Sequence, residues 1–237
     1  MANENDKKRS ALYRLRKLVL RPFWQLRDRI VPKYRPEQYW RERHKRHGFA
    51  YRGVGNWTQS EEENIEEYKK ERAIFLEFCK KHGIDFSKVK MLDVGCGTGI
   101  FAEVFRDNGG TDYLGIDITD VLFEGLAERF PTFKFKKLDV GRQKLEGKFD
   151  LIIMISVAQH IVDEKLFSFA MQNIREHLAE NGTFIVTVWQ TDVYVKPQPH
   201  VVRRPVCYFQ REFEGYWFSD PEPFGTKNLY AVRKKPN

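Results

Sequence analysis

A glycine-rich turn is the part of this sequence best suited to hold a ligand. The apolar run from Val89 to Val94 predicts a buried strand, and glycines at positions 95, 97 and 99 follow it directly. The next residues, Ile100 to Arg106, have the spacing of an amphipathic helix. Glycine lets the backbone pass close to a ligand where a Cβ atom would collide, and a helix N-terminus attracts polar groups. Strand, turn and helix together predict a nucleotide-type cofactor site.

Two common nucleotide-binding turns do not fit this spacing. A dinucleotide turn needs a third glycine at position 100, where this chain has Ile100. The Gly-Lys-Ser/Thr ending of a phosphate-binding loop is absent from the turn as well.

Acidic residues stand at the ends of the next predicted strands. The run from Tyr113 to Asp117 predicts a second strand whose acid, about twenty residues past the turn, is placed to bind ribose hydroxyls. Phe133 to Leu138 predicts a third strand, followed by an acid that can meet an adenine amino group. Phe149 to Met154 predicts a fourth strand. The carboxyl ends of such parallel strands line a ligand crevice.

This order of motifs resembles the class I S-adenosylmethionine-dependent methyltransferases over roughly residues 60–189. The resemblance implies a Rossmann-like α/β fold with a mostly parallel, seven-stranded sheet. It also implies S-adenosylmethionine as cofactor, S-adenosylhomocysteine as its product, and no metal. By the same resemblance, the expected cofactor-binding residues are Asp93, Gly95, Gly97, Asp117, Ile118, Asp139, Val140 and Ser156.

An upstream motif adds two expected donor-binding residues. Tyr39-Trp40 with Arg43 resembles the Tyr-Trp-x-x-Arg motif that precedes the fold in several small-molecule and sugar methyltransferases. That resemblance implies that Tyr39 and Arg43 bind the methionine end of the donor, guanidinium to carboxylate. An arginine on a solvated helix is the alternative, since the neighbouring residues are also basic. We expect His44 at the surface, and the turn at 52–56 as a lid over the donor.

His160 is the candidate catalytic base. It follows the fourth predicted strand, and an imidazole can accept a hydroxyl proton near neutral pH. The alternative is a histidine that only bonds a backbone carbonyl. Gln159 and Asp163 are secondary candidates, and Asp163 is also placed to cap a helix.

Composition limits the compartment and the domain count. The 237 residues suit one α/β domain plus an extension. Three cysteines far apart indicate neither a disulfide framework nor a metal knuckle, and we expect a cytoplasmic location. No apolar run reaches membrane-spanning length.

Positive charge is concentrated at the N-terminus. The first 50 residues hold fifteen Lys/Arg and five Asp/Glu, whereas the rest hold twenty-six and twenty-eight. We therefore predict a basic amphipathic extension over residues 1–36 and a methyltransferase domain over residues 37–237. Residues 10–30 have helical apolar spacing, which leaves three partners open: a membrane surface, a nucleic acid, or the chain itself, including a second copy in a homodimer. The slightly acidic balance of residues 51–237 makes the nucleic acid the weaker of these.

The C-terminal region is expected to supply antiparallel strands. Val206 to Phe218 and Leu229 to Arg233 have strand-like composition, and Pro197, Pro199 and Pro205 leave little room for a helix. Upstream of the glycine turn, Ser60 and Glu63 predict a capping box that opens a helix.

The expected function is methyl transfer from S-adenosylmethionine to a hydroxyl of a sugar, glycan or other small metabolite. Such an acceptor can be free or carried on lipid at the membrane surface. Two alternatives stay open. One is an RNA methyltransferase, and the other is a non-catalytic, cofactor-binding partner subunit.

Overall fold

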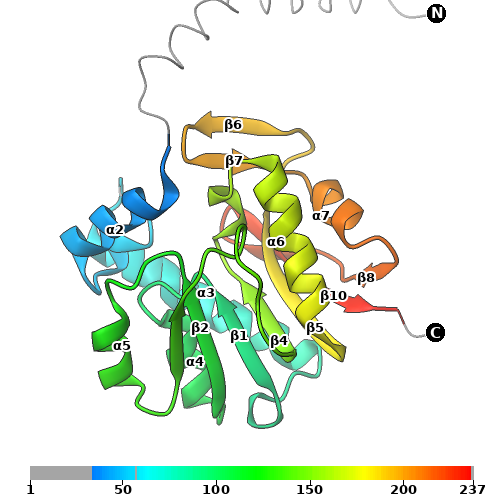
Figure 1. The fold of residues 1–237 in the computed structure, drawn as a ribbon, viewed down its shortest axis with the longest axis horizontal. Coiled ribbons are helices and arrows are strands. Elements are labelled where there is room, and N and C mark those ends of the chain that lie inside the picture. The colour runs from blue at the N-terminus through cyan, green and yellow to red at the C-terminus, as the bar shows by residue number, and fades with distance from the viewer. Residues whose placement is uncertain (1–33, 57, 236–237) are drawn as a thin grey trace, which may run out of the picture. The chain divides into compact units, whose positions relative to one another are not determined.

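Five parallel strands form the middle of the computed structural model, which describes residues 34–56 and 58–235. They lie side by side in the order β3-β2-β1-β4-β5 (Figure 1). Their bounds are β1 Lys90–Val94, β2 Asp112–Asp117, β3 Lys134–Lys137, β4 Phe149–Met154 and β5 Leu178–Trp189. The predicted strands are therefore present, in the order of a Rossmann-like sheet, and the mostly parallel α/β fold is confirmed.

Three antiparallel strands complete the sheet. β10 (Lys227–Lys234) pairs with β5, and both β8 (Tyr216–Phe218) and β9 (Glu222–Phe224) pair with β10. The sheet thus has eight strands instead of the predicted seven. The additional strand arises because Gly225, with φ +59°, turns β9 back onto β10 through a two-residue connection.

A helix replaces most of the strand predicted at 206–218. Residues Val206–Glu212 form α7, and only Tyr216–Phe218 is extended. Pro205 is the residue before the first helical turn, where its missing N–H costs no hydrogen bond. Pro205 therefore precedes this helix directly, and the expectation that the prolines leave little room for a helix was wrong.

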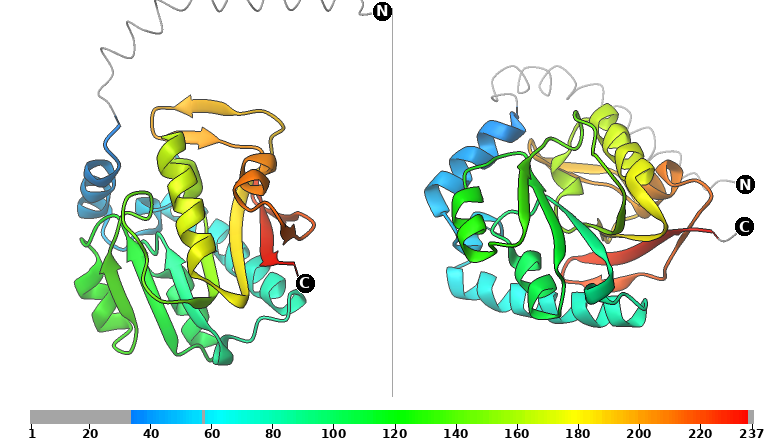
Figure 2. Two further views of the ribbon diagram at one scale, coloured as in Figure 1. Left: turned by 45° about the vertical axis from the view of Figure 1, so that its right-hand side comes forward. Right: turned by 60° about the horizontal axis from the view of Figure 1, so that its bottom comes forward.

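Helices cover both faces of the sheet, because neighbouring residues on the central strands are buried alternately on opposite sides. Leu151 and Ile153 belong to one core, and Ile152 and Met154 to the other. The first core lies under α3 (Glu61–Lys81), α4 (Ile100–Asp107) and α5 (Phe123–Arg129). The second lies under α6 (Glu164–His177) and α7 (Figure 2).

Two helix starts follow the predicted capping chemistry. Ser60 accepts from the Glu63 backbone N–H, and the Glu63 carboxylate accepts from the Ser60 N–H, so the capping box of α3 is confirmed. Asp163 caps α6 by accepting from the backbone of Lys165 and Leu166. These caps fix the ends of the helices that flank the carboxyl edge of the sheet.

Short elements border that carboxyl edge. They are α2 (Pro36–His47), the 3₁₀ turns at Tyr51–Gly53 and Ala158–His160, and a hairpin of β6 (Val195–Gln198) and β7 (Val201–Arg203). Tyr39 of α2 stacks on His200, in the hairpin turn, with 4.7 Å between ring centroids. The helix α2 and the β6–β7 hairpin therefore contact each other at the carboxyl edge of the sheet.

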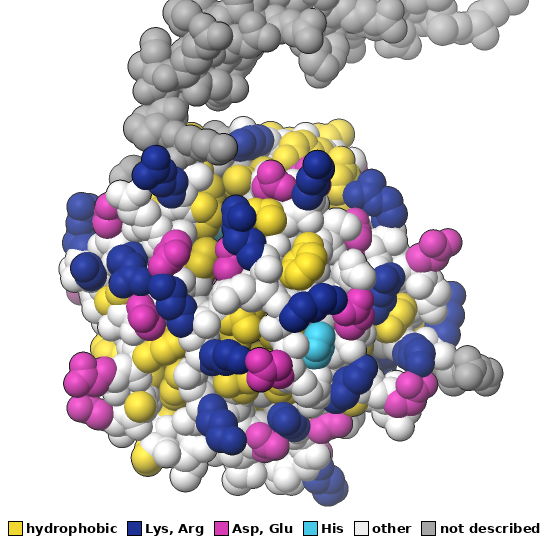
Figure 3. Space-filling model, in the orientation of Figure 1, with side chains coloured by type: hydrophobic (Ala, Val, Ile, Leu, Met, Phe, Trp, Pro, Cys, Tyr) yellow, Lys and Arg dark blue, Asp and Glu magenta, His cyan; other side chains and the backbone are white. Residues whose placement is uncertain are grey.

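All of these elements belong to one compact unit, Pro36–Asn237. Residues 10–30, with their predicted membrane, nucleic-acid or subunit contacts, lie outside the described residues. Within residues 34–56 and 58–235, no helix is long and apolar enough to cross a bilayer. The face in Figure 3 shows Lys and Arg side chains scattered among acidic ones, with no continuous basic track for a nucleic acid.

Candidate active site

The glycine turn has the backbone geometry of a ligand cradle. Gly95 and Gly97 have φ values of +78° and +50°, which residues other than glycine rarely adopt. A Cβ atom on Gly95 would lie 2.4 Å from Val157, and one on Gly97 would lie 3.0 Å from Val54. The backbone of the turn therefore packs directly against Val157 and Val54, and a side chain at either glycine would displace them. Positive φ and the missing Cβ atoms together form the tight strand-to-helix turn that a nucleotide-type site requires.

Asp117 borders the glycine turn from the neighbouring strand. Its two carboxylate oxygens accept from the backbone N–H groups of Gly97, at 3.2 Å, and Thr119, at 3.0 Å. These contacts place a carboxylate next to the turn, and a carboxylate is the group that accepts hydrogen bonds from ribose hydroxyls in nucleotide sites. Burial raises the pKa of Asp117 to about 6, while these backbone donors oppose the shift. The next residue, Ile118, is half-buried beside this edge.

Asp93 lies deeper than the other predicted cofactor-binding acids. It is 2% exposed, and its carboxylate accepts a hydrogen bond of 2.8 Å from the Tyr113 hydroxyl. Burial raises the pKa of Asp93 to about 7. Asp93 therefore ties β1 to β2 directly beneath the glycine turn, and its contact with a cofactor stays a prediction.

Asp139 and Val140 lie where β3 ends, next to the end of β2. The Leu138 N–H donates to the Asp117 carbonyl, which holds these two strand ends together. The Asp139 carboxylate accepts from the Gly141 N–H and pairs with the Arg142 guanidinium. Val140 is buried. Asp139 and Val140 therefore lie next to the end of β2, and the Asp139 carboxylate stabilises the turn that follows it. Their contact with a cofactor stays a prediction.

Arg43 of α2 points at the 51–56 segment. Its guanidinium donates to the carbonyls of Arg52 and Gly55 and to the Tyr39 hydroxyl. The segment continues to Val54, which covers the Gly97 position of the glycine turn. Arg43 therefore holds the 51–56 segment against the glycine turn. That this segment is a lid, and that Tyr39 and Arg43 bind the methionine end of the donor, stay predictions.

His44 is a correction to the sequence-based expectation. It was predicted at the surface, but it is 3% exposed, and its Nδ1 lies 3.0 Å from the Thr119 hydroxyl. Burial lowers the pKa of His44 to about 4. It is buried because α2 lies over the end of β2, a long-range contact that the local run of basic residues does not reveal.

His160 lies at the other side of the site, against α2 and the hairpin. Its ring packs edge-on against Trp40, with centroids 4.9 Å apart. Its Nδ1 is 2.9 Å from the His200 carbonyl and must donate to it, so Nε2 carries the free lone pair. Burial lowers the pKa of His160 to about 3, opposed by this hydrogen bond, so the neutral ring is present at physiological pH.

Ser156 connects β4 to the antiparallel part of the sheet. Among the described residues it is the one non-glycine residue with positive φ, at +59°. Its N–H donates to the Thr187 hydroxyl, and its own hydroxyl accepts from Lys227 Nζ at 3.0 Å. The positive φ of Ser156 redirects the chain just after β4 ends. The predicted role of Ser156 in donor binding stays a prediction.

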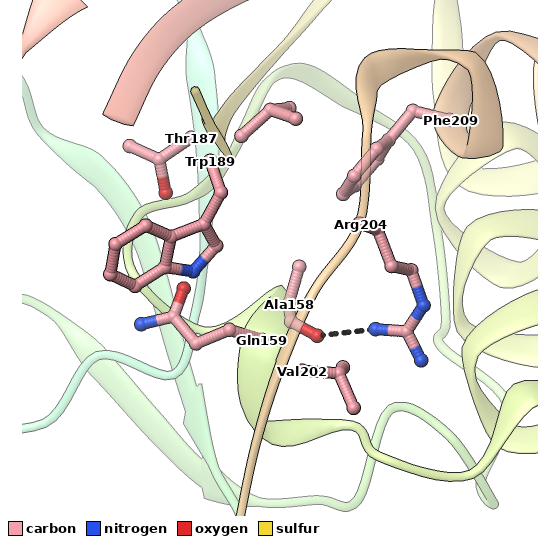
Figure 4. Close-up of a pocket in the computed structure, with 8 residues that line it drawn as sticks. Ala158, Gln159, Thr187, Trp189, Val202, Arg204 and Phe209 are labelled. Atoms are coloured by element: carbon pink, nitrogen blue, oxygen red, sulfur yellow. Dashed lines mark hydrogen bonds between the residues drawn. The ribbon is translucent and has the colours of Figure 1, made fainter. Parts of the chain in front are cut away.

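A small pocket lies beside this turn, between β5 and the hairpin (Figure 4). Gln159 and Trp189 line it on one side, and Gln159 Nε2 is 3.4 Å from His160 Nε2. On the other side, Arg204 donates to the Ala158 carbonyl, and its guanidinium also pairs with Glu164. Arg204 therefore holds the pocket wall in place, whereas Gln159 connects the pocket with the candidate base.

Several polar residues of this region were missed from the sequence. They are His200, Lys227, Trp189 and Glu71, which come from the hairpin, β10, β5 and α3. No spacing rule connects them, because they meet only when the antiparallel strands and α3 pack at one edge. In the described part of the chain, no group of three His, Cys, Asp or Glu side chains has the arrangement of a metal site.

Comparisons with known proteins identify the family. The family model described as a methyltransferase domain matches residues 60–228. Trans-aconitate 2-methyltransferase of Agrobacterium fabrum is 36% identical over 95 residues, which is 40% of this chain and 36% of that protein. The eEF1A lysine and N-terminal methyltransferase of Bos taurus is 26% identical over 144 residues, 58% of this chain. The matched part is about a fifth of that relative, which is much the longer protein.

Solved structures agree on the fold. Magnesium protoporphyrin IX methyltransferase from Synechocystis PCC 6803, with bound S-adenosylmethionine, superposes with a TM-score of 0.63 at 15% identity, over 86% of this chain and all of that one. A Burkholderia thailandensis 1,6-didemethyltoxoflavin-N1-methyltransferase with bound S-adenosylhomocysteine gives 0.60 at 18% identity, over 87% and 93% of the two chains. The chain therefore belongs to the methyltransferase domain family, with the fold of the class I S-adenosylmethionine-dependent methyltransferases.

Proposed function

We propose that this chain binds S-adenosylmethionine at the glycine turn and transfers its methyl group to a hydroxyl oxygen of a small acceptor, such as a sugar. The residues present fit that donor. Gly95 and Gly97 give the turn its positive-φ backbone without side chains, and the Asp117 carboxylate lies beside it, bonded to the Gly97 N–H. When bound, the sulfonium of the donor supplies an electrophilic methyl group. The chain itself must orient the acceptor, exclude water and accept a proton.

The state of His160 is the observation that carries the hydroxyl assignment. The His200 carbonyl fixes the proton on Nδ1, so Nε2 faces the Gln159 side with a lone pair. A hydroxyl oxygen that gains a methyl group becomes strongly acidic, so even a weakly basic imidazole can take its proton. The low pKa of His160 keeps the ring unprotonated and ready for that transfer.

The relatives do not agree on an acceptor. Their names include a protein lysine methyltransferase, a trans-aconitate methyltransferase and a ubiquinone biosynthesis O-methyltransferase of Rickettsia typhi. We favour a small hydroxyl-bearing acceptor over RNA, because positive and negative side chains are nearly balanced over residues 34–235, with 31 Lys/Arg and 30 Asp/Glu. Donor binding without turnover on any acceptor would instead favour a non-catalytic partner subunit.

The test is a pair of histidine variants. We expect His160→Ala to lower turnover by about 10²–10⁴-fold, while affinity for S-adenosylhomocysteine stays within threefold of the wild type. His177→Ala is the matched control, because His177 also places Nδ1 against a backbone carbonyl but lies at the end of α6. Turnover is measured as S-adenosylhomocysteine formation with a panel of monosaccharides, phenols and carboxylic acids.

Two results would contradict the proposal. One is methyl transfer to nitrogen, carbon or a carboxylate in preference to hydroxyl oxygen. The other is full turnover by His160→Ala together with a lower melting temperature, which would make His160 a packing residue.

A further inference from the structure

Lys227 is a half-buried lysine that has no ion-pair partner among the described residues and lies where β4 and β5 end. It is the first residue of β10 and pairs in register with Trp189, the last residue of β5. Its Nζ donates to the Ser156 hydroxyl, and it lies 5.3 Å from the centroid of the Trp189 ring. Within residues 34–56 and 58–235, no carboxylate oxygen lies within the 4.0 Å of an ion pair with it.

Two acids lie nearby but beyond ion-pair distance, and both oppose the effect of burial on the pKa of Lys227. A Cβ atom on Gly225 would lie 3.6 Å from a Glu67 oxygen and 3.7 Å from a Glu71 oxygen, so both carboxylates border the turn before Lys227. Glu71 is 6% exposed, and burial raises its pKa to about 7 against the opposing effect of Lys227. Glu71 is therefore partly protonated at neutral pH. Burial in turn lowers the pKa of Lys227, as expected for a charge that lacks a full counterion.

Other hydrogen-bond donors and cations converge on the same place. The indole N–H of Trp189 is buried and has no hydrogen-bond partner among the described residues. The Arg203 guanidinium lies 4.3 Å from the Trp189 ring centroid. Arg43, with its guanidinium bonded to neutral groups, is close enough to His160 to depress the pKa of that ring together with Lys227. Donors without acidic partners are the arrangement that binds an anion.

We propose that Lys227 binds a carboxylate or phosphate group of a ligand at the carboxyl edge of β4 and β5. The proposal rests on the function proposed above, because it assigns the charge of a ligand of that same site. Two ligands can bring the anion. One is the donor, through the carboxylate of its methionine part, and the other is an acidic acceptor.

The first arm of the test asks whether the donor brings the anion. Calorimetry on the full chain compares S-adenosylhomocysteine with 5′-methylthioadenosine, which keeps the nucleoside and lacks the carboxylate. If Lys227 binds the donor, Lys227→Met weakens S-adenosylhomocysteine about tenfold or more and leaves 5′-methylthioadenosine unchanged. Lys227→Arg retains most of the affinity, because it keeps the charge.

The second arm asks whether an acceptor brings the anion. Citrate and inorganic phosphate are titrated separately against the full chain, with and without saturating S-adenosylhomocysteine, and the melting temperature is recorded. If the anion belongs to the acceptor, one of these probes raises the melting temperature of the wild type and of Lys227→Arg. The same probe then has no such effect on Lys227→Met.

Controls keep the outcome decisive. Lys134→Met removes an exposed lysine at the opposite end of the sheet and should behave as the wild type in both arms. Lys227→Met should melt at or above the wild-type temperature without ligand, because a buried charge is removed. If it does so and matches the wild type in both arms, Lys227 binds no anion and the proposal is overturned. Failure of the wild type to bind S-adenosylhomocysteine would instead refute the proposed function, and the titration without that ligand would still decide on Lys227.

Discussion

The donor side and the acceptor side of the proposed site are built in different ways. The glycine turn and Asp117, the centre of the donor side, come from one stretch, residues 90–117. The acceptor side gathers Trp40, His160 and His200 from three segments far apart in the sequence, and Lys227 from a fourth segment borders it. A backbone cradle depends on local geometry and tolerates change elsewhere. A side-chain cluster depends on how α2, the hairpin and β10 pack.

The comparison implies different sensitivities. Substitutions on the donor side should weaken donor binding, and the loss of binding free energy should grow with the number of hydrogen bonds removed. Substitutions in the covering segments should act through the position of the lid, with smaller effects. Substitutions beneath the turn should change stability and leave binding almost intact.

The largest effect is expected at Asp117. Asp117→Ala removes the acceptor of two ribose hydroxyl hydrogen bonds, worth about 1.5–3 kcal/mol each, so affinity for S-adenosylhomocysteine should fall about 10²–10⁴-fold. Calorimetry measures this directly. Asp112→Ala is the control, because Asp112 is the exposed first residue of the same strand, at the opposite edge of the sheet. Affinity within threefold of the wild type would show that the cradle does not depend on this carboxylate.

A smaller effect is expected at Arg43, where the lid is held. Arg43→Met removes the hydrogen bonds to the carbonyls of Arg52 and Gly55, and charged hydrogen bonds of this kind contribute about 1.5–3 kcal/mol when buried. Since Arg43 is half-buried, we expect about tenfold weaker S-adenosylhomocysteine binding and faster amide hydrogen exchange over residues 51–56.

Arg41 provides the matched control for the lid. It lies on the same helix, and its ion pairs with Glu37 and Asp120 are solvent-exposed and worth little. Arg41→Met should therefore leave both measurements unchanged. If Arg43→Met behaves in the same way, the 51–56 segment is not a lid that Arg43 holds.

The smallest effect on donor binding is expected at Asp93. A substitution there should instead change how the free energy of unfolding depends on pH. The pKa of Asp93 rises from 3.8 to about 7 on folding, so between these values the folded state holds a proton that the unfolded state has released. Stability from this group is therefore lost as the pH rises through that window, by at most about 1.4 kcal/mol per pH unit.

Asp93→Asn isolates this contribution. Asparagine keeps an oxygen for the Tyr113 hydroxyl but has no titrating proton. Denaturant unfolding from pH 4 to 8 should show the variant gaining stability relative to the wild type as the pH rises to about 7, and no further gain above it. A constant difference across this range would mean that Asp93 titrates normally.

The sequence by itself determined the donor side. Three glycines between an apolar strand and an amphipathic helix, followed by an acid at the next strand end, form a local pattern that one stretch of chain can satisfy. The capping box of α3, the Asp163 cap of α6 and the apolar strands are local in the same sense. The glycine turn, Asp117 and the mostly parallel sheet could therefore be predicted, and the bounds of the first four strands differ by at most one residue.

Only the tertiary structure decided the acceptor side. Whether His44 is at the surface or buried depends on α2 lying over the end of β2, and the tautomer of His160 depends on a carbonyl forty residues away. Lys227 lies at this site only because β10 pairs with β5 and brings its ammonium beside Ser156. Contacts of this kind join segments whose own sequences carry no signal for one another, because burial and hydrogen bonding are settled only when the chain has folded.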